Sequence, residues 1–330
     1  NESAIKHYVE VLSDLKKRNI KVMLTLHHFT NPLWFLEMGG WANPKSVYYF
    51  KRYINFVLKY IGGLVDLWIT INEPGVYTDL GYLKGVWVPR KKKPFEALLV
   101  YINMARAHKM AYHLIHKKIS GAQVGFAMNV MSFASYHKHR IIELLSVHIA
   151  DRFINHSFYD LTKNTHDFLG INYYFRVRLT QRDDKVIPEV EEITEGEREM
   201  SDVGWTIYPH GIFDVLMDLG DFKKPIYITE NGVAAANDEK RQRFLVNHLI
   251  EIHHAIQAGV DVRGYFHWSL LDNFEWEKGF EAKFGLVECD QRNFARKLKP
   301  SAKLYAEIAK ENALSKNVCQ DKHHLLGLIF

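Results

Sequence analysis

The sequence contains few of the features that mark membrane, disulfide-rich or nucleic-acid-binding proteins. Only two of its 330 residues are cysteine, so no disulfide framework is expected, and this composition favours a reducing, cytoplasmic compartment. No apolar run approaches the roughly 20 residues of a membrane span. The formal net charge is only +5, and the basic run at 90–93 accompanies no nucleic-acid-binding motif. We therefore expect no membrane partner and no nucleic-acid partner.

Signals for cofactors and metals are also missing. No Gly-rich phosphate-binding motif follows a predicted strand, which argues against a dinucleotide fold. His27 and His28 are adjacent on a predicted strand, so their side chains should point to opposite faces and cannot chelate one ion together. We expect neither a cofactor nor a metal. His28 is predicted to be a hydrogen-bonding group in a pocket, and His27 is predicted to pack between elements.

Strands and helices are expected to alternate along the chain, and 47% hydrophobic residues suffice for a large core. This alternation predicts a parallel sheet covered by helices. Polar and aromatic residues cluster after the strand ends, which favours a (β/α)8 barrel. Predicted strands cover 21–26, 65–71, 123–129, 168–174, 225–229 and 262–268, and predicted helices cover 1–19, 46–60, 95–118, 148–161, 208–220, 238–258 and 300–313.

The segments between these elements are expected to be loops. Residues 75–94 and the region from 269 to about 290 are predicted loops, and the charged stretch 181–202 is predicted to be an exposed loop or hairpin. Residues 1–313 should form one domain, and the tail 314–330 matches no pattern. The chain starts at Asn1 inside a predicted helix, from which we expect that the N-terminus is missing.

Two glutamates follow apolar strands, and each stands beside an asparagine. Ile228-Thr-Glu230-Asn-Gly ends one strand, and Leu67-Trp-Ile-Thr-Ile-Asn-Glu73-Pro ends another. A carboxylate at such a position is costly unless it is paired, hydrogen-bonded or in use. Breaking a glycosidic bond requires an acid and a base or nucleophile, which two carboxyls can supply. A retaining enzyme would hold them about 5–5.5 Å apart. For either glutamate alone, a salt bridge or a helix cap is an equally good interpretation.

The segment Trp268–Trp276 interleaves aromatic residues with Asp272, Asn273 and Glu275. Sugars offer flat apolar faces for stacking and vicinal hydroxyls for polar groups. An ordinary helical core stripe would not place these polar residues between the aromatics. The composition of this segment therefore favours sugar binding over simple packing.

The two glutamate segments resemble the signature segments of glycoside hydrolase family 1, the retaining β-glucosidases and β-galactosidases. The similarity extends over about residues 1–313 and includes the segments Leu26–Phe29, Gly39–Trp41, Gly170–Tyr174 and Lys283–Val287. The resemblance implies a (β/α)8 TIM barrel and a small-molecule β-glycoside or oligosaccharide as substrate.

The resemblance also implies a role for each matching residue. Glu73 would be the acid/base and Glu230 the nucleophile. Asn72 would bind the sugar 2-hydroxyl, and Tyr174 would hydrogen-bond the nucleophile. The remaining positions would form the sugar pocket: His28, Trp268, Glu275 and Trp276 around the glycone, Phe284 lining the same pocket, and Trp205 on the aglycone side.

Departures from the family pattern narrow these expectations. Glu73 is kept, unlike in the family's thioglucosidases, and Glu275 would repel a phosphate, so an unphosphorylated sugar is expected. The first two strand–helix units of the family's barrel are absent, and they normally supply a glycone-binding Gln and an Arg beside the nucleophile. Two alternatives therefore stay open: an incomplete barrel that binds a sugar or a partner without hydrolysis, and transglycosylation through the same covalent intermediate.

Overall fold

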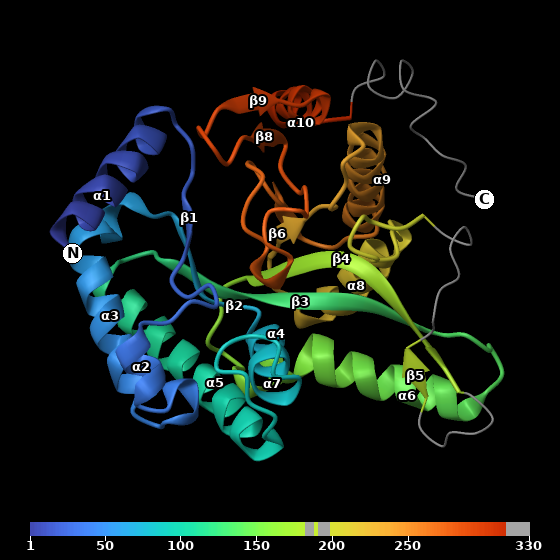
Figure 1. Cartoon of the computed structure of the whole chain (residues 1–330), viewed down its shortest axis with the longest axis horizontal. Coiled ribbons are helices and arrows are strands. Elements are labelled where there is room, and N and C mark those ends of the chain that lie inside the picture. Colours follow the sequence, from blue (N-terminus) through green and yellow to red (C-terminus); the bar gives the residue numbers. More distant parts are fainter. Residues whose placement is uncertain (182–187, 191–198, 315–330) are drawn as a thin grey trace. The chain divides into compact units, whose positions relative to one another are not determined.

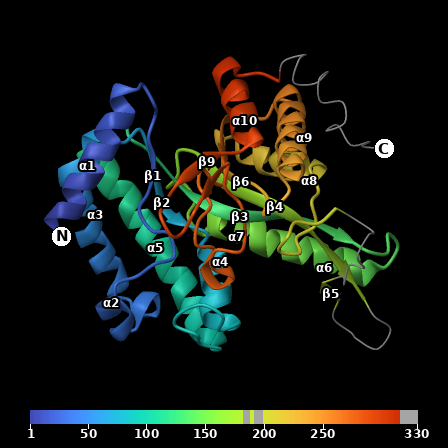
Figure 2. The same ribbon diagram turned by 45° about the horizontal axis from the view of Figure 1, so that its top comes forward.

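The computed structural model describes residues 1–181, 188–190 and 199–314. The chain forms two compact units, whose elements are shown in Figure 1 and Figure 2. Unit 1 consists of Asn1–Asn129 and Asn155–Gly170, and unit 2 consists of Val130–Ile154 and Ile171–Phe330. The chain passes between the units within β3 (Gln123–Ser135), within the helical turn η4 (Arg152–His156) and within β4 (Leu169–Thr180).

Unit 1 is built on parallel strands. β1 (Met23–Thr25) pairs with β2 (Leu67–Asn72), and β2 pairs with the first part of β3. All six residues of β2 are buried, as expected for a parallel strand covered on both faces. The helices and helical turns of this unit are α1 (Glu2–Lys17), α2 (Leu33–Glu37), η1 (Gly40–Ala42), α3 (Ser46–Ile61), η2 (Gly62–Leu64), α4 (Pro74–Thr78), η3 (Asp79–Leu83), α5 (Pro94–Lys118) and α7 (Ser157–Leu161).

Unit 2 repeats this arrangement. β4, β6 (Ile226–Asn231) and β7 (Val262–His267) are neighbours in this order, and β6 and β7 are parallel. A separate antiparallel hairpin joins β8 (Val287–Cys289) to β9 (Arg296–Leu298). The remaining elements, apart from η4 (Arg152–His156) at the boundary of the units, are α6 (Ile141–Asp151), β5 (Glu189–Val190), α8 (His210–Leu219), η5 (Gly220–Phe222), α9 (Asp238–Gln257), η6 (Trp276–Lys278) and α10 (Pro300–Glu311).

Local sequence signals explain several helix ends. The side chain of Asn1 accepts hydrogen bonds from the backbone N–H groups of Ser3 and Ala4 and so caps α1. Asn237 caps α9 in the same way by accepting from Glu239 N–H. α5 and α10 each begin with proline, at Pro94 and Pro300, where the missing N–H costs no helical hydrogen bond.

The structure corrects several predicted element boundaries. The predicted loop 75–94 contains α4 and η3, and the predicted loop before residue 290 leads into the β8–β9 hairpin. β1 is shorter than predicted, whereas β3 and β4 extend six residues beyond the predicted ends at 129 and 174. The predicted helix 148–161 begins earlier, at Ile141, and divides into α6, η4 and α7.

Part of the predicted excursion 181–202 is described. β5 pairs antiparallel with β4, through Leu179–Val190 and Thr180–Glu189, as a hairpin would. Residues 182–187 and 191–198 lie outside the described residues, as does nearly all of the predicted tail, residues 315–330.

His108 on α5 connects two distant parts of unit 1 through buried hydrogen bonds. Its Nε2 lies 2.6 Å from the carbonyl oxygen of Thr165, and its Nδ1 lies 2.7 Å from the hydroxyl oxygen of Thr70 on β2. A carbonyl can only accept, so Nε2 carries the proton and Nδ1 accepts from Thr70. Burial lowers the pKa of His108 to about 3, because a charged imidazolium is disfavoured away from water.

We predict that His108 makes folding stability depend on pH. Between about pH 6.5, the pKa of an unfolded histidine, and about pH 3, the unfolded chain binds one more proton at this residue than the folded chain. Stability is therefore lost as the pH falls through this window. In His108→Gln the unfolding free energy should change less steeply with pH, by up to about 1.4 kcal/mol per pH unit.

Urea denaturation between pH 4 and pH 7 measures this slope. His253→Gln, which replaces an exposed histidine on α9, is the matched control and should retain the wild-type slope. Equal slopes for wild type and His108→Gln would contradict the prediction.

Candidate active site

Glu73 immediately follows the fully buried strand β2 and precedes α4. Its backbone has φ 43° and ψ 61°, in the left-handed region that residues other than glycine seldom adopt. Its N–H donates to the carbonyl of Ala127 at 2.8 Å, which extends the β2–β3 ladder by one residue. Such conformations persist where the surroundings enforce them, and they occur at functional positions.

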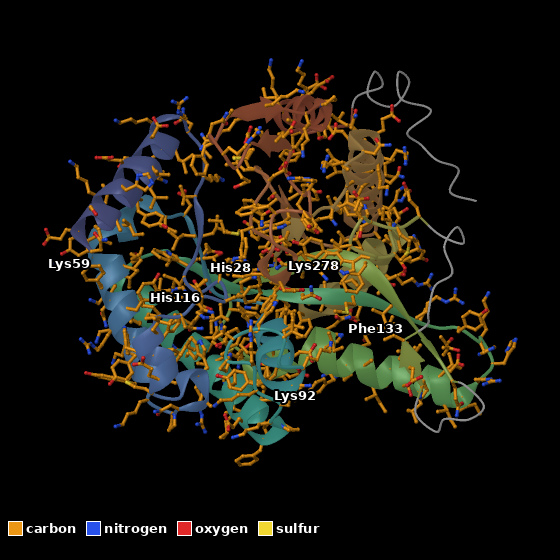
Figure 3. The ribbon with its side chains drawn as sticks, in the orientation of Figure 1. His28, Lys59, Lys92, His116, Phe133 and Lys278 are labelled. Atoms are coloured by element: carbon orange, nitrogen blue, oxygen red, sulfur yellow. The ribbon has the colours of Figure 1, made fainter. Side chains whose placement is uncertain are left out.

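An amide group contacts this carboxylate in unit 1, and an imidazole contacts the preceding residue, Asn72. The Nδ2 of Asn129 donates to Glu73 Oε1 at 3.4 Å, and Glu73 is only 6% exposed. The Nδ2 of Asn72 lies 3.3 Å from the Nε2 of His28, which follows β1 and is labelled in Figure 3. Burial lowers the pKa of His28 to about 4, so the imidazole is neutral near pH 7 and can accept from Asn72. Three of the predicted site residues, His28, Asn72 and Glu73, are therefore neighbours.

His27 has the packing role that the sequence predicted. It makes edge-to-face contacts with Trp41 and Tyr77, with ring centroids 5.1 and 5.8 Å apart. The indole N–H of Trp41 donates to His27 Nε2 at 3.2 Å. His27 therefore packs against aromatic residues, whereas the adjacent His28 makes a polar contact with Asn72.

Glu230 occupies the next-to-last position of β6, in unit 2. The hydroxyl of Tyr174, from β4, donates to Glu230 Oε2 at 2.5 Å. Thr229 donates to the side-chain oxygen of Asn172 at 2.6 Å, and Asn231 donates to the carbonyl of Tyr173 at 2.7 Å. These bonds on both sides of Glu230 fix β6 against β4, so the carboxylate sits in a rigid frame.

Aromatic rings form a cluster around Tyr174. Its ring centroid lies 5.4 Å from that of Trp205 and 6.2 Å from that of Phe284, and these two are 6.0 Å apart. Trp268 packs against the same cluster. Four of the predicted substrate-binding residues, Tyr174, Trp205, Trp268 and Phe284, are thus in one place, beside Glu230.

Glu275 lies in the loop that follows Trp268. The Nδ2 of Asn273 donates to Glu275 Oε2 at 3.0 Å. Burial raises the pKa of Glu275, although hydrogen bonds from Asn273 and Trp268 act in the opposite direction. Trp276 begins the short turn η6, with φ 47°, and the exposed Lys278 of the same turn is labelled in Figure 3.

Asp272 holds this loop in place. Its Oδ1 accepts from the N–H of Gly285 at 2.9 Å and from Lys299 Nζ at 3.1 Å, and the residue is buried. The sequence grouped Asp272 with sugar-binding polar residues, but its oxygens are bound within the protein. Its role in the structure is to fix the Trp268–Phe284 loop.

Sequence reasoning missed Asn129 as a neighbour of the site. The available signal was an asparagine at the end of the predicted strand 123–129, the same pattern that drew attention to Asn72 and Asn231. Unlike those two asparagines, Asn129 has no glutamate beside it in the sequence. The partner carboxylate, Glu73, comes from a different strand.

Comparisons with known proteins identify the family. The sequence profile described as Glycosyl hydrolase family 1 matches residues 1–163 and 151–314. The chain belongs to glycosyl hydrolase family 1. It is 32% identical over 356 residues to a β-galactosidase from Sulfolobus acidocaldarius, covering 95% of this chain and 71% of that protein. It is also 32% identical to β-glucosidase A of Acetivibrio thermocellus, covering 94% of this chain and 79% of that protein.

Solved structures of this family have the same fold. A β-glycosidase from Pyrococcus horikoshii matches with a TM-score of 0.91 and 36% identity, covering 97% of this chain and 78% of that chain. A β-glucosidase from Thermotoga maritima in complex with deoxynojirimycin matches with a TM-score of 0.88 and 27% identity, covering 96% of this chain and 79% of that one. The predicted fold class, a (β/α)8 barrel lacking its first two strand–helix units, is confirmed, and the chain is a glycosidase of family 1.

Gly232 provides a sharp test of the unit 2 site geometry. A Cβ at this position would lie 1.8 Å from the carbonyl oxygen of Trp268, which is backbone and cannot rotate away. We predict that Gly232→Ala displaces the β6–β7 strand ends, lowers stability by about 1–3 kcal/mol or more, and lowers glycosidase activity.

Thermal unfolding and turnover of an aryl β-glucoside measure the two effects. Gly63→Ala is the control, because a Cβ at Gly63 would meet nothing within 4 Å. A Gly232→Ala protein that matches the control in both measurements would show that Trp268 does not approach β6 this closely.

Proposed function

We propose that this chain hydrolyses terminal, unphosphorylated β-D-glucosyl or β-D-galactosyl residues with retention of configuration. Glu230 is the nucleophile and Glu73 is the acid/base. The observation that carries this assignment is the hydrogen bond from Tyr174 to Glu230, which leaves the carboxylate oriented in a cluster of sugar-compatible aromatic rings.

The environments of the two carboxyls support different roles. Glu230 accepts a hydrogen bond from the hydroxyl of Tyr174, and such a donor stabilises the ionised carboxylate that a nucleophile requires. Glu73 is buried, and its carboxylate accepts a hydrogen bond from the neutral amide of Asn129. Such surroundings suit a group that must hold a proton before it transfers it.

The reaction follows from these roles. Glu230 attacks the anomeric carbon and forms a covalent glycosyl-enzyme while Glu73 protonates the leaving oxygen. Glu73, now ionised, then removes a proton from water, and the hydroxide oxygen displaces Glu230 from the anomeric carbon. Two inversions give net retention, and both carboxyls return to their starting protonation states.

The relatives and Glu275 support the substrate class. The similar proteins carry the names β-galactosidase and β-glucosidase, and one similar structure is a complex with deoxynojirimycin. Glu275 is held by Asn273 and by Trp268, which packs on the aromatic cluster, and this supports a glycone-binding carboxylate. Its negative charge favours neutral sugars with free hydroxyls over phosphorylated ones.

Replacing Glu230 tests the nucleophile. We predict that Glu230→Gly lowers turnover of an aryl β-glucoside by about 10⁴-fold. Azide should restore turnover by entering the vacated space and attacking the anomeric carbon once, which yields a glycosyl azide of inverted, α configuration. Glu277→Gln, which replaces an exposed glutamate in the loop after Trp268, is the matched control.

Undiminished turnover in Glu230→Gly would end the assignment. A wild-type chain without turnover would favour a non-catalytic sugar-binding protein.

Replacing Glu73 tests the acid/base role through leaving-group dependence. We predict that Glu73→Gln lowers hydrolysis of an unactivated disaccharide by about 10²–10⁴-fold. With a dinitrophenyl β-glucoside, whose leaving group needs no proton, the first step should survive as a burst. Azide should then speed the second step and give a β-glycosyl azide. Glu37→Gln, exposed on α2, is the control. Equal losses on both substrates would argue against proton donation by Glu73.

A further inference from the structure

Helix α6 presents its apolar side chains to solvent, the reverse of an ordinary helix that packs on a sheet. Ile141 is 79% exposed, Leu145 56% and Phe153, in the following turn η4, 69%. Monomeric soluble proteins seldom expose a contiguous apolar patch of this kind without a binding role. The outward face is formed by Ile141, Ile142, Leu144, Leu145, Ile149 and Phe153.

The orientation of α6 is fixed by hydrogen bonds on its inner side. The fully buried carboxylate of Glu143 accepts from the backbone N–H and the Nδ1 of His137 and from the backbone N–H of Gln181. Burial alone would raise the pKa of Glu143, but these donors hold it below the usual value. Rotating the helix to bury its apolar face would remove Glu143 from all three donors. The exposed face is therefore the stable arrangement of unit 2.

Basic and aromatic groups border the same face. Lys138 and His139 precede the helix and are exposed, and His148 is exposed among the apolar residues. Next to them, the guanidinium of Arg178 stacks on the exposed ring of Tyr136 at 4.6 Å. Both acids of the helix are turned inward, Glu143 fully and Asp151 to half-burial. In both ribbon views α6 lies along the extended ends of β3 and β4, at the side where Figure 3 labels Phe133.

We propose that α6 is an interfacial helix, whose outward face inserts among the acyl chains of an anionic lipid bilayer while Lys138, His139 and His148 meet the headgroups. An aliphatic face bordered by basic residues and tyrosine is the chemistry that such surfaces recognise. A second copy of the chain fits this face less well, because an isologous contact would bring two faces bordered by basic residues together.

This contact needs no membrane-spanning segment. Among the helices of residues 1–181, 188–190 and 199–314, none is long and apolar enough to cross a bilayer. The sequence-based expectation of no membrane partner depended on the lack of a membrane-spanning run. A helix that lies in the membrane–water interface requires only one apolar face. The proposal is also independent of the hydrolytic mechanism, since α6 contributes none of the proposed site residues.

Vesicle co-sedimentation of the whole 330-residue chain tests the proposal. The chain should sediment with mixed phosphatidylcholine–phosphatidylglycerol vesicles and more weakly with phosphatidylcholine alone. Leu145→Glu should lower binding by about tenfold or more on both, since a carboxylate enters the apolar face. Lys138→Glu should lower binding to the anionic vesicles and leave the weaker binding to the neutral vesicles unchanged.

The matched control is Leu98→Glu on α5, where leucine is 54% exposed and so resembles Leu145 in all but its surroundings. Thermal unfolding and turnover of a soluble aryl β-glucoside should be equal in the variants and the wild type, which excludes misfolding. Failure of the wild type to bind either vesicle would overturn the proposal. Equal losses in Leu145→Glu and Leu98→Glu would also overturn it, as would a dimer that Leu145→Glu converts to a monomer in size-exclusion chromatography without any vesicle binding.

Discussion

A carboxylate placed directly after a buried parallel strand must exchange its hydration for hydrogen bonds from the protein, and the candidate site depends on this constraint. β2 is buried along its whole length, and Glu73 lies at the end of its backbone hydrogen-bond ladder. The carboxylate of Glu73 therefore needs side chains as hydrogen-bond partners. In unit 2 the same need is met at β6 by the hydroxyl of Tyr174. An unpaired buried charge would cost several kcal/mol, so the neighbours of each glutamate are part of the fold as much as of the chemistry.

The asparagine beside each glutamate has a different role in the two places. Asn231 donates to the carbonyl of Tyr173 and accepts from the hydroxyl of Tyr265, so it joins β6 to both neighbouring strands. Asn72 instead meets the side chain of His28. The first asparagine therefore positions its glutamate through the backbone, whereas the second presents polar groups among side chains. The pairs Asn72-Glu73 and Glu230-Asn231 differ because Asn231 hydrogen-bonds to both strands beside β6, whereas Asn72 contacts the side chain of His28.

The same balance between polar anchoring and apolar burial explains α6. Residues 141–149 are rich in Ile and Leu, yet the structure buries Glu143 and exposes the leucines. Three donors from His137 and Gln181 compensate the desolvation of this carboxylate. The hydrophobic periodicity of the sequence does not show that these donors lie within hydrogen-bond distance of Glu143. The outward apolar face follows from this one buried acid. It gives the chain a surface that is chemically distinct from the site at the strand ends.

The sequence by itself determined the alternation of strands and helices and most element positions, because buried parallel strands are continuous apolar runs. It also located Glu73, Glu230, His28 and the Trp268 segment, because polar groups after apolar strands are conspicuous. Only the tertiary structure decided that Asn129 contacts Glu73 and that Asp272 accepts hydrogen bonds from Lys299 and Gly285. It also decided that β3 and β4 continue past their predicted ends. Those outcomes depend on contacts between segments more than ten residues apart, and a local pattern of residues holds no information about which distant partner satisfies a buried polar group.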